Sequence, residues 1–141
     1  MRAEAFRTGC AALVKAPLTF VIDVDGTRNV LTLRFSGVVT VAHIQAAVAE
    51  VECRLADVGR RFVAVTDLRD LEAMELDCAP HLARMMDLFR ESGVGKVVRL
   101  IPDPHKDIGF NILSATHYRG KVKVITCATV AELERALEDG A

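Results

Sequence analysis

The chain has 141 residues, a length that fits one ordinary domain with a core of its own. Apolar residues make up 51% of it and charged residues 26%, a balance that excludes a disordered chain. The formal net charge of -1, the single tyrosine and the lack of tryptophan argue against a nucleic-acid-binding protein, and no stretch reaches the roughly 18 apolar residues that span a bilayer.

The chain opens with a hairpin pattern. Residues 1–16 are interpreted as a lead-in, and residues 17–141 as one domain. Residues 18–24 are rich in β-branched and aromatic side chains, and an Asp-Gly pair follows, which is a strong turn signal between apolar runs. The return strand, 29–36, alternates, with Phe35 on the predicted inner face.

Helical and strand patterns alternate after the hairpin. Thr40 is a plausible N-cap, and apolar residues spaced by three and four predict a helix from there to about Val58. The same spacing predicts a helix that ends at Ser92-Gly93 and buries Phe89. Further elements follow the same criteria: strands at 62–65, 97–101 and 121–126, and helices at 107–118 and from Thr129, which is expected to form a capping box with Glu132. This order predicts an α/β fold with a mixed, mostly parallel sheet.

The cysteines bear on the cellular compartment. Cys10, Cys53, Cys78 and Cys127 are far apart in the sequence and form no C-x-x-C pair. No apolar segment long enough for a secretion signal precedes Cys10. We therefore expect four free thiols and a cytoplasmic location.

Acidic residues crowd into one segment, 66–77, which the sequence predicts to be a polar loop. Its charged members are Asp67, Arg69, Asp70, Glu72, Glu75 and Asp77. Ligands of open α/β sheets bind beyond the carboxyl ends of parallel strands, where this loop would lie. Clustered carboxylates are suited to cation binding or acid–base chemistry, but the spacing matches no calcium loop. A solvated loop with local pairing to Arg69 is the favoured interpretation.

Other candidate groups point to no catalytic centre. His105 and Lys106 precede a predicted helix, where backbone N–H groups favour an anion, so they are a candidate anion-binding pair, with a proline-braced surface loop as the plainer alternative. The histidines lack metal-ligand spacing, so we expect neither a metal nor another cofactor. Cys78 and His81 lie close together at a predicted helix start, but no third group orients them. We therefore expect a protein that is not an enzyme.

The order of elements resembles the STAS domain, in its SpoIIAA-like, anti-sigma-factor-antagonist-like bacterial branch. The local tracts that carry the resemblance are Phe35-Ser36-Gly37 and Val65-Thr66-Asp67-Leu68, and it spans roughly residues 18–140. The resemblance implies a β-hairpin followed by βα units. It also implies a regulatory role through a protein partner or a small ligand, without catalysis.

The resemblance also locates a regulatory position, where this chain departs from the family pattern. Matching Asp67-Leu68 to the end of the family's third strand puts Glu75 at its acidic position and Leu76 and Asp77 at its phosphorylatable serine pair. No hydroxyl stands there. Asp77 is then either a helix N-cap or a permanent negative charge that imitates a phosphoserine.

These observations lead to one main hypothesis and one alternative. The main hypothesis is a cytoplasmic regulatory domain whose partner-binding residues are Asp67, Arg69, Asp70, Glu75, Leu76 and Asp77. The alternative is a small binding module for an apolar or lipid-like ligand, which rests on fold analogy. An exposed apolar patch around Leu76 favours a protein partner, whereas a large apolar pocket favours the ligand.

Overall fold

The computed structural model describes residues 19–101, 118 and 122–138, and these ranges contain one α/β unit. Its elements in chain order are β1 (Phe20–Asp25), β2 (Val30–Val39), α2 (Val41–Arg54), η2 (Leu55–Asp57), β3 (Val63–Met74), η3 (Leu76–Cys78), α3 (Ala79–Glu91), β4 (Lys96–Leu100), β5 (Lys123–Cys127) and α5 (Val130–Glu138). The predicted lead-in at 1–16 and the predicted helix at 107–118 lie outside the described residues, apart from Tyr118.

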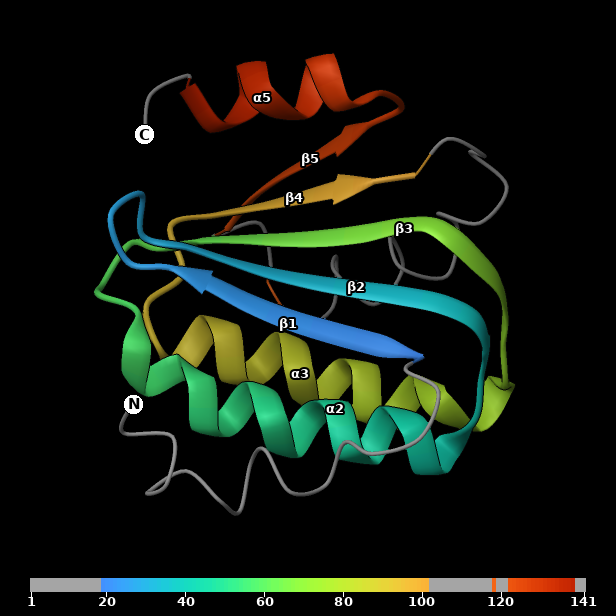
Figure 1. Ribbon diagram of the computed structural model, residues 1–141. Helices are drawn as coiled ribbons and strands as arrows, with labels where there is room; N and C mark the ends of the chain where they lie inside the picture. Colours follow the sequence, from blue (N-terminus) through green and yellow to red (C-terminus); the bar gives the residue numbers. More distant parts are fainter. Residues whose placement is uncertain (1–18, 102–117, 119–121, 139–141) are drawn as a thin grey trace, which may run out of the picture.

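One five-stranded sheet forms the centre of the molecule, with its strands in the order β1-β2-β3-β4-β5. The β1–β2 hairpin is antiparallel, and every later pair is parallel. Helices α2 and α3 lie side by side against one face, and α5 lies over the other face near β4 and β5 (Figure 1). The predicted mixed, mostly parallel α/β sheet is confirmed.

The larger core fills the space between the sheet and the α2–α3 layer. Leu31, Leu33 and Phe35 alternate along β2 and are buried there, as the alternation predicted. Phe89 of α3 is also buried and meets Phe62 edge to face, with ring centroids 6.1 Å apart. A smaller apolar cluster lies between the opposite face and α5. Both phenylalanines singled out in the sequence are therefore core residues.

The segment predicted to be a loop is instead part of a long strand. β3 runs from Val63 to Met74 and pairs with β2 almost throughout, so residues 66–74 are strand and the prediction of a loop was wrong. The pairing register shifts twice, once between Arg34 and Ser36 and again between Gly37 and Val38. Each shift adds one residue to β3, which is a bulge. The buried Leu68 and Leu71 are therefore three apart, and the period of two that identifies a strand is lost.

The bulged ends of β2 and β3 change direction. Both strands bend towards the helix layer, where β2 leads into α2 and β3 leads through η3 into α3 (Figure 1). Gly37 lies at the second register shift with φ +68°, a backbone conformation that glycine adopts without steric cost. The bend carries the end of β3 from the flat sheet to the start of both helices.

The helix ends follow the predicted caps in part. Thr40 is the N-cap of α2, as expected, but the α-helix ends at Arg54 and continues only as the 3₁₀ turn η2, short of Val58. At the start of α5, the Thr129 hydroxyl accepts a hydrogen bond from the Glu132 N–H at 3.1 Å. The Glu132 carboxylate accepts a hydrogen bond from the N–H of Ala128. In a standard capping box it would accept from the N–H of the N-cap residue, Thr129.

Strand β1 forms one edge of the described sheet, and α2 reaches it through Arg54. The Arg54 guanidinium donates a hydrogen bond to the backbone carbonyl of Ile22 at 3.1 Å. The carboxylates of Asp57, at 3.3 Å, and Glu50, at 3.9 Å, hold it from the α2 side. Burial raises the pKa of Glu50, and one of its carboxylate oxygens is buried without a hydrogen-bond partner in the structure.

The cysteines depart from the expectation of four thiols. Cys78 and Cys127 are free and buried. Cys53 of α2 is disulfide-bonded, and its partner lies outside the described residues. The distance between cysteines along a chain does not reveal which of them meet in space, so the sequence could not indicate this bond. A cytoplasmic location stays a prediction, and reduced cysteines no longer support it.

Candidate functional site

The six residues predicted to bind a partner fall into two groups. Asp67, Arg69 and Asp70 lie on β3, within the sheet, whereas Glu75, Leu76 and Asp77 lie at η3, between β3 and α3. His105 and Lys106 lie outside the described residues, so the anion-binding pair stays a prediction. We call residues 75–77 the η3 tip.

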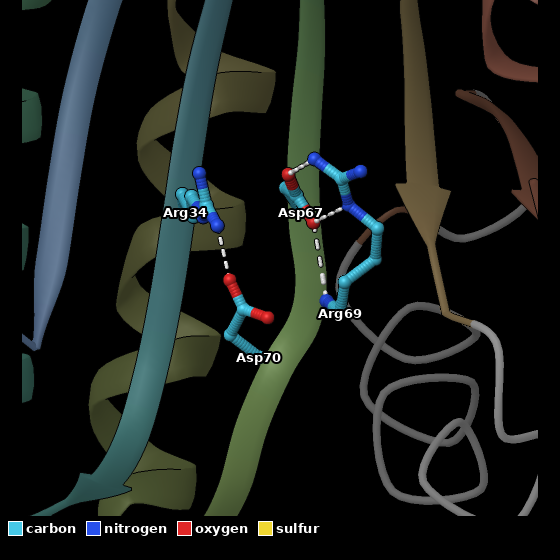
Figure 2. A network of polar contacts seen from close by, with 4 residues as sticks. All are labelled: Arg34, Asp67, Arg69 and Asp70. Atoms are coloured by element: carbon cyan, nitrogen blue, oxygen red, sulfur yellow. Dashed lines mark hydrogen bonds and ion pairs between the residues drawn. The ribbon is translucent and has the colours of Figure 1, made fainter. Parts of the chain in front are cut away.

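The group on β3 is a network of charged side chains with Arg34 of β2. All four lie on the face of the sheet turned away from α3 (Figure 2). Arg69 holds Asp67 with three hydrogen bonds: its backbone N–H and its Nε donate to Oδ1 at 3.1 and 3.0 Å, and Nη2 donates to Oδ2 at 2.8 Å. The predicted local pairing of Arg69 is therefore confirmed, although on a strand and not in a loop.

Asp67 is the buried member of this network, with 6% of its surface exposed. Burial by itself would raise the pKa of this carboxyl group. The hydrogen bonds and charge of Arg69, together with the charge of Arg34, outweigh that effect and hold the pKa below its usual value. Asp67 is thus a paired structural carboxylate, not a free base suited to proton transfer.

Arg34 is a network member that the sequence reasoning missed. It forms an ion pair with Asp70, and both side chains are about half exposed. The alternation of β2 placed Arg34 on the outward face, and the strand register sets it opposite Asp67. Arg34 was not identified because its contact with Asp70 depends on the pairing of β2 with β3 and on the first bulge, which no local pattern reveals.

At the η3 tip, Glu75 fastens the end of β3 to the start of α2. Its backbone N–H donates to the Val39 carbonyl at 3.0 Å, and its carboxylate accepts a hydrogen bond from the Val41 N–H at 2.9 Å. The Glu75 carbonyl in turn accepts from the Cys78 N–H at 2.9 Å. The tip is therefore held by backbone and side-chain bonds on both sides.

Leu76 projects from this fastened segment, with 92% of its surface exposed. Val38 of β2, which pairs with Ala73 three residues before Leu76, is a further large exposed apolar residue at 51%. Both exposed apolar side chains therefore lie near the end of the β2–β3 pair, and a protein partner that covers them stays a prediction.

Asp77 does not cap α3. It lies inside the 3₁₀ turn, and the N-cap position of the helix belongs to Cys78, whose side chain makes no capping bond. The interpretation of Asp77 as an N-cap was wrong because the short η3 turn moves the start of the α-helix by one residue. Its carboxylate still lies just before a helix N-terminus, where negative charge is favourable.

Cys78 lacks the properties of a nucleophile. The residue is buried, and its Sγ lies 3.7 Å from the Val39 carbonyl, to which the thiol donates. Burial, followed by the charge of Glu75, raises the pKa of the thiol. A position at a helix start lowers a cysteine pKa only where the side chain faces the exposed N–H groups, and here it points into the core.

The structure gives little room for a small ligand between the sheet and α3. A cavity of about 20 Å³ lies there, enough for one water molecule. Its lining includes Phe35, Met86, Phe89, the buried Arg99 and Tyr118, whose pKa burial raises. This cavity does not support the alternative of a lipid-like ligand. Among the described residues no cluster of histidine, cysteine and acidic side chains could hold a metal ion, and no helix is long and apolar enough to cross a membrane.

Comparison with known proteins identifies the fold. No protein-family model and no curated protein matches the sequence. The structure is similar to the anti-sigma factor antagonist SpoIIAA in its unphosphorylated form, with a TM-score of 0.59 and 17% identity over 85% of this chain and 98% of that one. It is also similar to an uncharacterised protein of the DUF3478 family with a SpoIIAA-like fold from Shewanella loihica PV-4 (TM-score 0.65, 13% identity, 88% and 98% covered). An anti-sigma factor antagonist from Mycobacterium paratuberculosis gives a TM-score of 0.55 at 21% identity over 89% of this chain and all of that one.

These similarities confirm the fold expected from the sequence. The chain has a SpoIIAA-like fold, with one antiparallel pair followed by parallel strands and helices. At these levels of identity the likeness is one of fold, and the site must be argued from this chain's own residues.

Proposed function

We propose that this chain is a non-enzymatic regulatory domain that binds a protein partner through the η3 tip and the neighbouring end of β2. The observation that carries the proposal is the exposure of Leu76 on a segment fixed by Glu75. The anti-sigma-factor antagonists that share the fold support a regulatory role.

The exposure of Leu76 favours a role in binding because hydrogen bonds fix the segment around it. A frayed loop exposes apolar side chains at random, whereas the η3 tip is tied to Val39 and Val41 by hydrogen bonds of 2.9 to 3.0 Å. Exposed aliphatic side chains that are scattered singly are common, but Leu76 shares its end of the molecule with Val38. A partner that covers both side chains gains the hydrophobic free energy of their burial.

The charge around Leu76 indicates the chemistry of the partner. Glu72, Glu75 and Asp77 are exposed acidic residues of this segment, and no basic residue lies between Asp70 and Asp77. A complementary surface has an apolar socket for Leu76 and a rim of lysine or arginine side chains. The same charge repels partners with an acidic surface, which contributes specificity.

This segment has no hydroxyl side chain that a kinase could phosphorylate. From Asp67 to Glu91 the sequence contains no serine, threonine or tyrosine. We propose that the permanent charge of Asp77 stands in the place of a switchable one, so that the partner-binding state of the tip does not depend on a kinase.

The test is a pull-down from native cell extract with the wild-type chain, Leu76→Asp and the matched control Val130→Asp. Val130 is also a half-exposed apolar residue, but it lies at the start of α5. A partner retained by wild type and by Val130→Asp, and lost with Leu76→Asp, supports the proposal. Equal retention by the wild type and both variants, with unchanged unfolding midpoints, contradicts it.

The Asp77 charge is tested with the partner so identified. Because Asp77 is not the N-cap, both Asp77→Ser and Asp77→Ala should leave the unfolding midpoint almost unchanged. If the charge is part of the interface, both should weaken binding by about tenfold, or 1.4 kcal/mol, and Asp77→Glu should retain it. Equal affinity in all four proteins would mean that the charge is not recognised.

A further inference from the structure

The start of α2 contains a capping box in which a histidine occupies the place usually taken by glutamate or glutamine. The His43 N–H donates to the Thr40 hydroxyl oxygen at 3.4 Å, and the Thr40 N–H donates to Nδ1 of His43 at 3.1 Å. Reciprocal bonds of this kind satisfy two backbone N–H groups that the helix itself leaves unpaired.

This geometry requires one particular state of the imidazole ring. Nδ1 accepts a hydrogen bond only when it carries no proton, so the ring must be neutral with its proton on Nε2. Protonation turns Nδ1 into a donor that faces another donor, the Thr40 N–H. It also places a positive charge at the positive end of the helix dipole. Glutamine in the same place would keep the bond at every pH.

The next N–H of the helix links this box to the η3 tip. Val41 donates to the carboxylate of Glu75, so two successive N–H groups, those of Thr40 and Val41, are satisfied by side chains from α2 and from the tip. A proton on His43 creates a cation beside this arrangement. Glu75 is the carboxylate already bound there, and its competing attraction to the imidazolium weakens the bond that fastens the tip.

The charged groups that the neighbouring elements bring to this end of α2 act on a protonated His43 in opposite directions. Glu75 and Asp77 come from η3, and His81 lies in the first turn of α3, which starts at the same end of the molecule (Figure 1). The two carboxylates attract a protonated His43, while a protonated His81 adds positive charge to the same end. Neither restores the acceptor that the Thr40 N–H loses.

We propose that His43 is a proton-sensitive latch: when neutral it closes the start of α2 and holds the η3 tip through Glu75, and when protonated it loosens both. Histidine is the side chain that changes charge between about pH 5 and 8, which sets the range over which the proposal is tested. Its role as a regulator of partner binding rests on the proposed function, but the latch itself is a property of the isolated chain.

The experiment follows the folded protein by NMR between pH 7.5 and 5.5, with no partner present. In the wild type, the amide signals of Thr40, Val41 and Leu76 should shift with the same midpoint as the imidazole signal of His43. Hydrogen-exchange protection of Thr40 and Val41 should fall about fivefold, the equilibrium equivalent of losing one helix cap.

Two variants separate the latch from other effects of pH. His43→Gln keeps an acceptor that does not titrate, so the amide shifts should vanish while protection stays at its neutral-pH level. His81→Gln, the matched control in α3, should behave as the wild type does. Amides that ignore the His43 titration, or that still titrate in His43→Gln, would overturn the proposal. These outcomes are read without a partner and so stand apart from the test of the proposed function.

Discussion

The two faces of the sheet follow different physical rules. Against α2 and α3, the strands present mainly buried aliphatic and aromatic side chains, with the buried Arg99 among them. In the described part of the chain, the opposite face has an apolar cluster beneath α5 that includes Val65, Val98 and Leu100. Elsewhere this face carries the network of Arg34, Asp67, Arg69 and Asp70 (Figure 2). One face is therefore packed against helices, whereas part of the other carries charged side chains.

This difference separates stability from recognition. Burial of apolar surface contributes most of the folding free energy, whereas exposed ion pairs contribute little. Substitutions on the α2–α3 face should therefore unfold the protein. Substitutions among the exposed charges and at the η3 tip should leave the fold intact and change what it binds.

The largest expected effect belongs to the packed face. Phe89→Ala should lower the free energy of unfolding by about 3–5 kcal/mol, because it removes a buried ring and leaves a cavity beside Phe62. Chemical denaturation measures the loss. Val130→Ala, a half-exposed position on α5, is the matched control and should cost less than about 1 kcal/mol. Equal losses in the two variants would remove the distinction between the faces.

The next effect belongs to the buried member of the charge network. Arg69→Ala leaves the carboxylate of Asp67 buried without its guanidinium and should cost about 1 kcal/mol, a modest value because Arg69 is itself partly exposed. The same variant combined with Asp67→Asn should recover part of the loss, since no buried charge then remains. A double-mutant cycle from denaturant unfolding measures this coupling; a coupling of zero would mean that the two hydrogen bonds from the guanidinium contribute nothing.

The pH dependence of stability should follow Asp67. Its pKa is lowered in the folded state, so the unfolded chain binds the proton more tightly and acid favours unfolding. The contribution is fully present above the ordinary carboxyl value of about pH 4 and is lost as the pH falls through the folded value. Urea midpoints measured from pH 5 down to 2.5 should decline less steeply in Asp67→Asn than in the wild type. Parallel curves would contradict the assignment.

The smallest effect is expected from the exposed half of the network. Arg34→Ala breaks the ion pair with Asp70, but both partners are in contact with water, so the unfolding midpoint should not change measurably. A loss as large as that of Arg69→Ala would show that the two pairs are not distinct, and that the whole open face acts as one structural unit.

Sequence patterns predicted the fold well where a strand or helix is regular. The alternation of β2 and the apolar spacing around Phe89 located the main core, and Thr40 marked the start of α2. The sequence patterns failed where bulges interrupt the alternation of a strand. The bulges in β3 break the period of two, so a strand that carries Asp67 to Asp70 was taken for a loop.

The candidate site was predicted in part for the same reason. Leu76 was identified by its place in the resemblance, and its exposure could be tested as soon as the fold was known. Arg34 and the bond from the Val41 N–H to Glu75 join segments more than thirty residues apart. Contacts of that kind depend on register and on the bend of two strands, and neither is encoded in a local window of sequence.

The contact of Arg54 with β1 bears on the tendency of the protein to aggregate at high concentration. Ile22 occupies a position whose backbone groups point away from β2, and an edge strand with free groups of this kind is a template on which another chain can add a strand and begin a fibril. The Arg54 guanidinium already donates a hydrogen bond to the Ile22 carbonyl, so this acceptor is not available to an added strand. Within the described sheet, the arginine that ends α2 thus removes one backbone acceptor from the edge on which a further strand could pair.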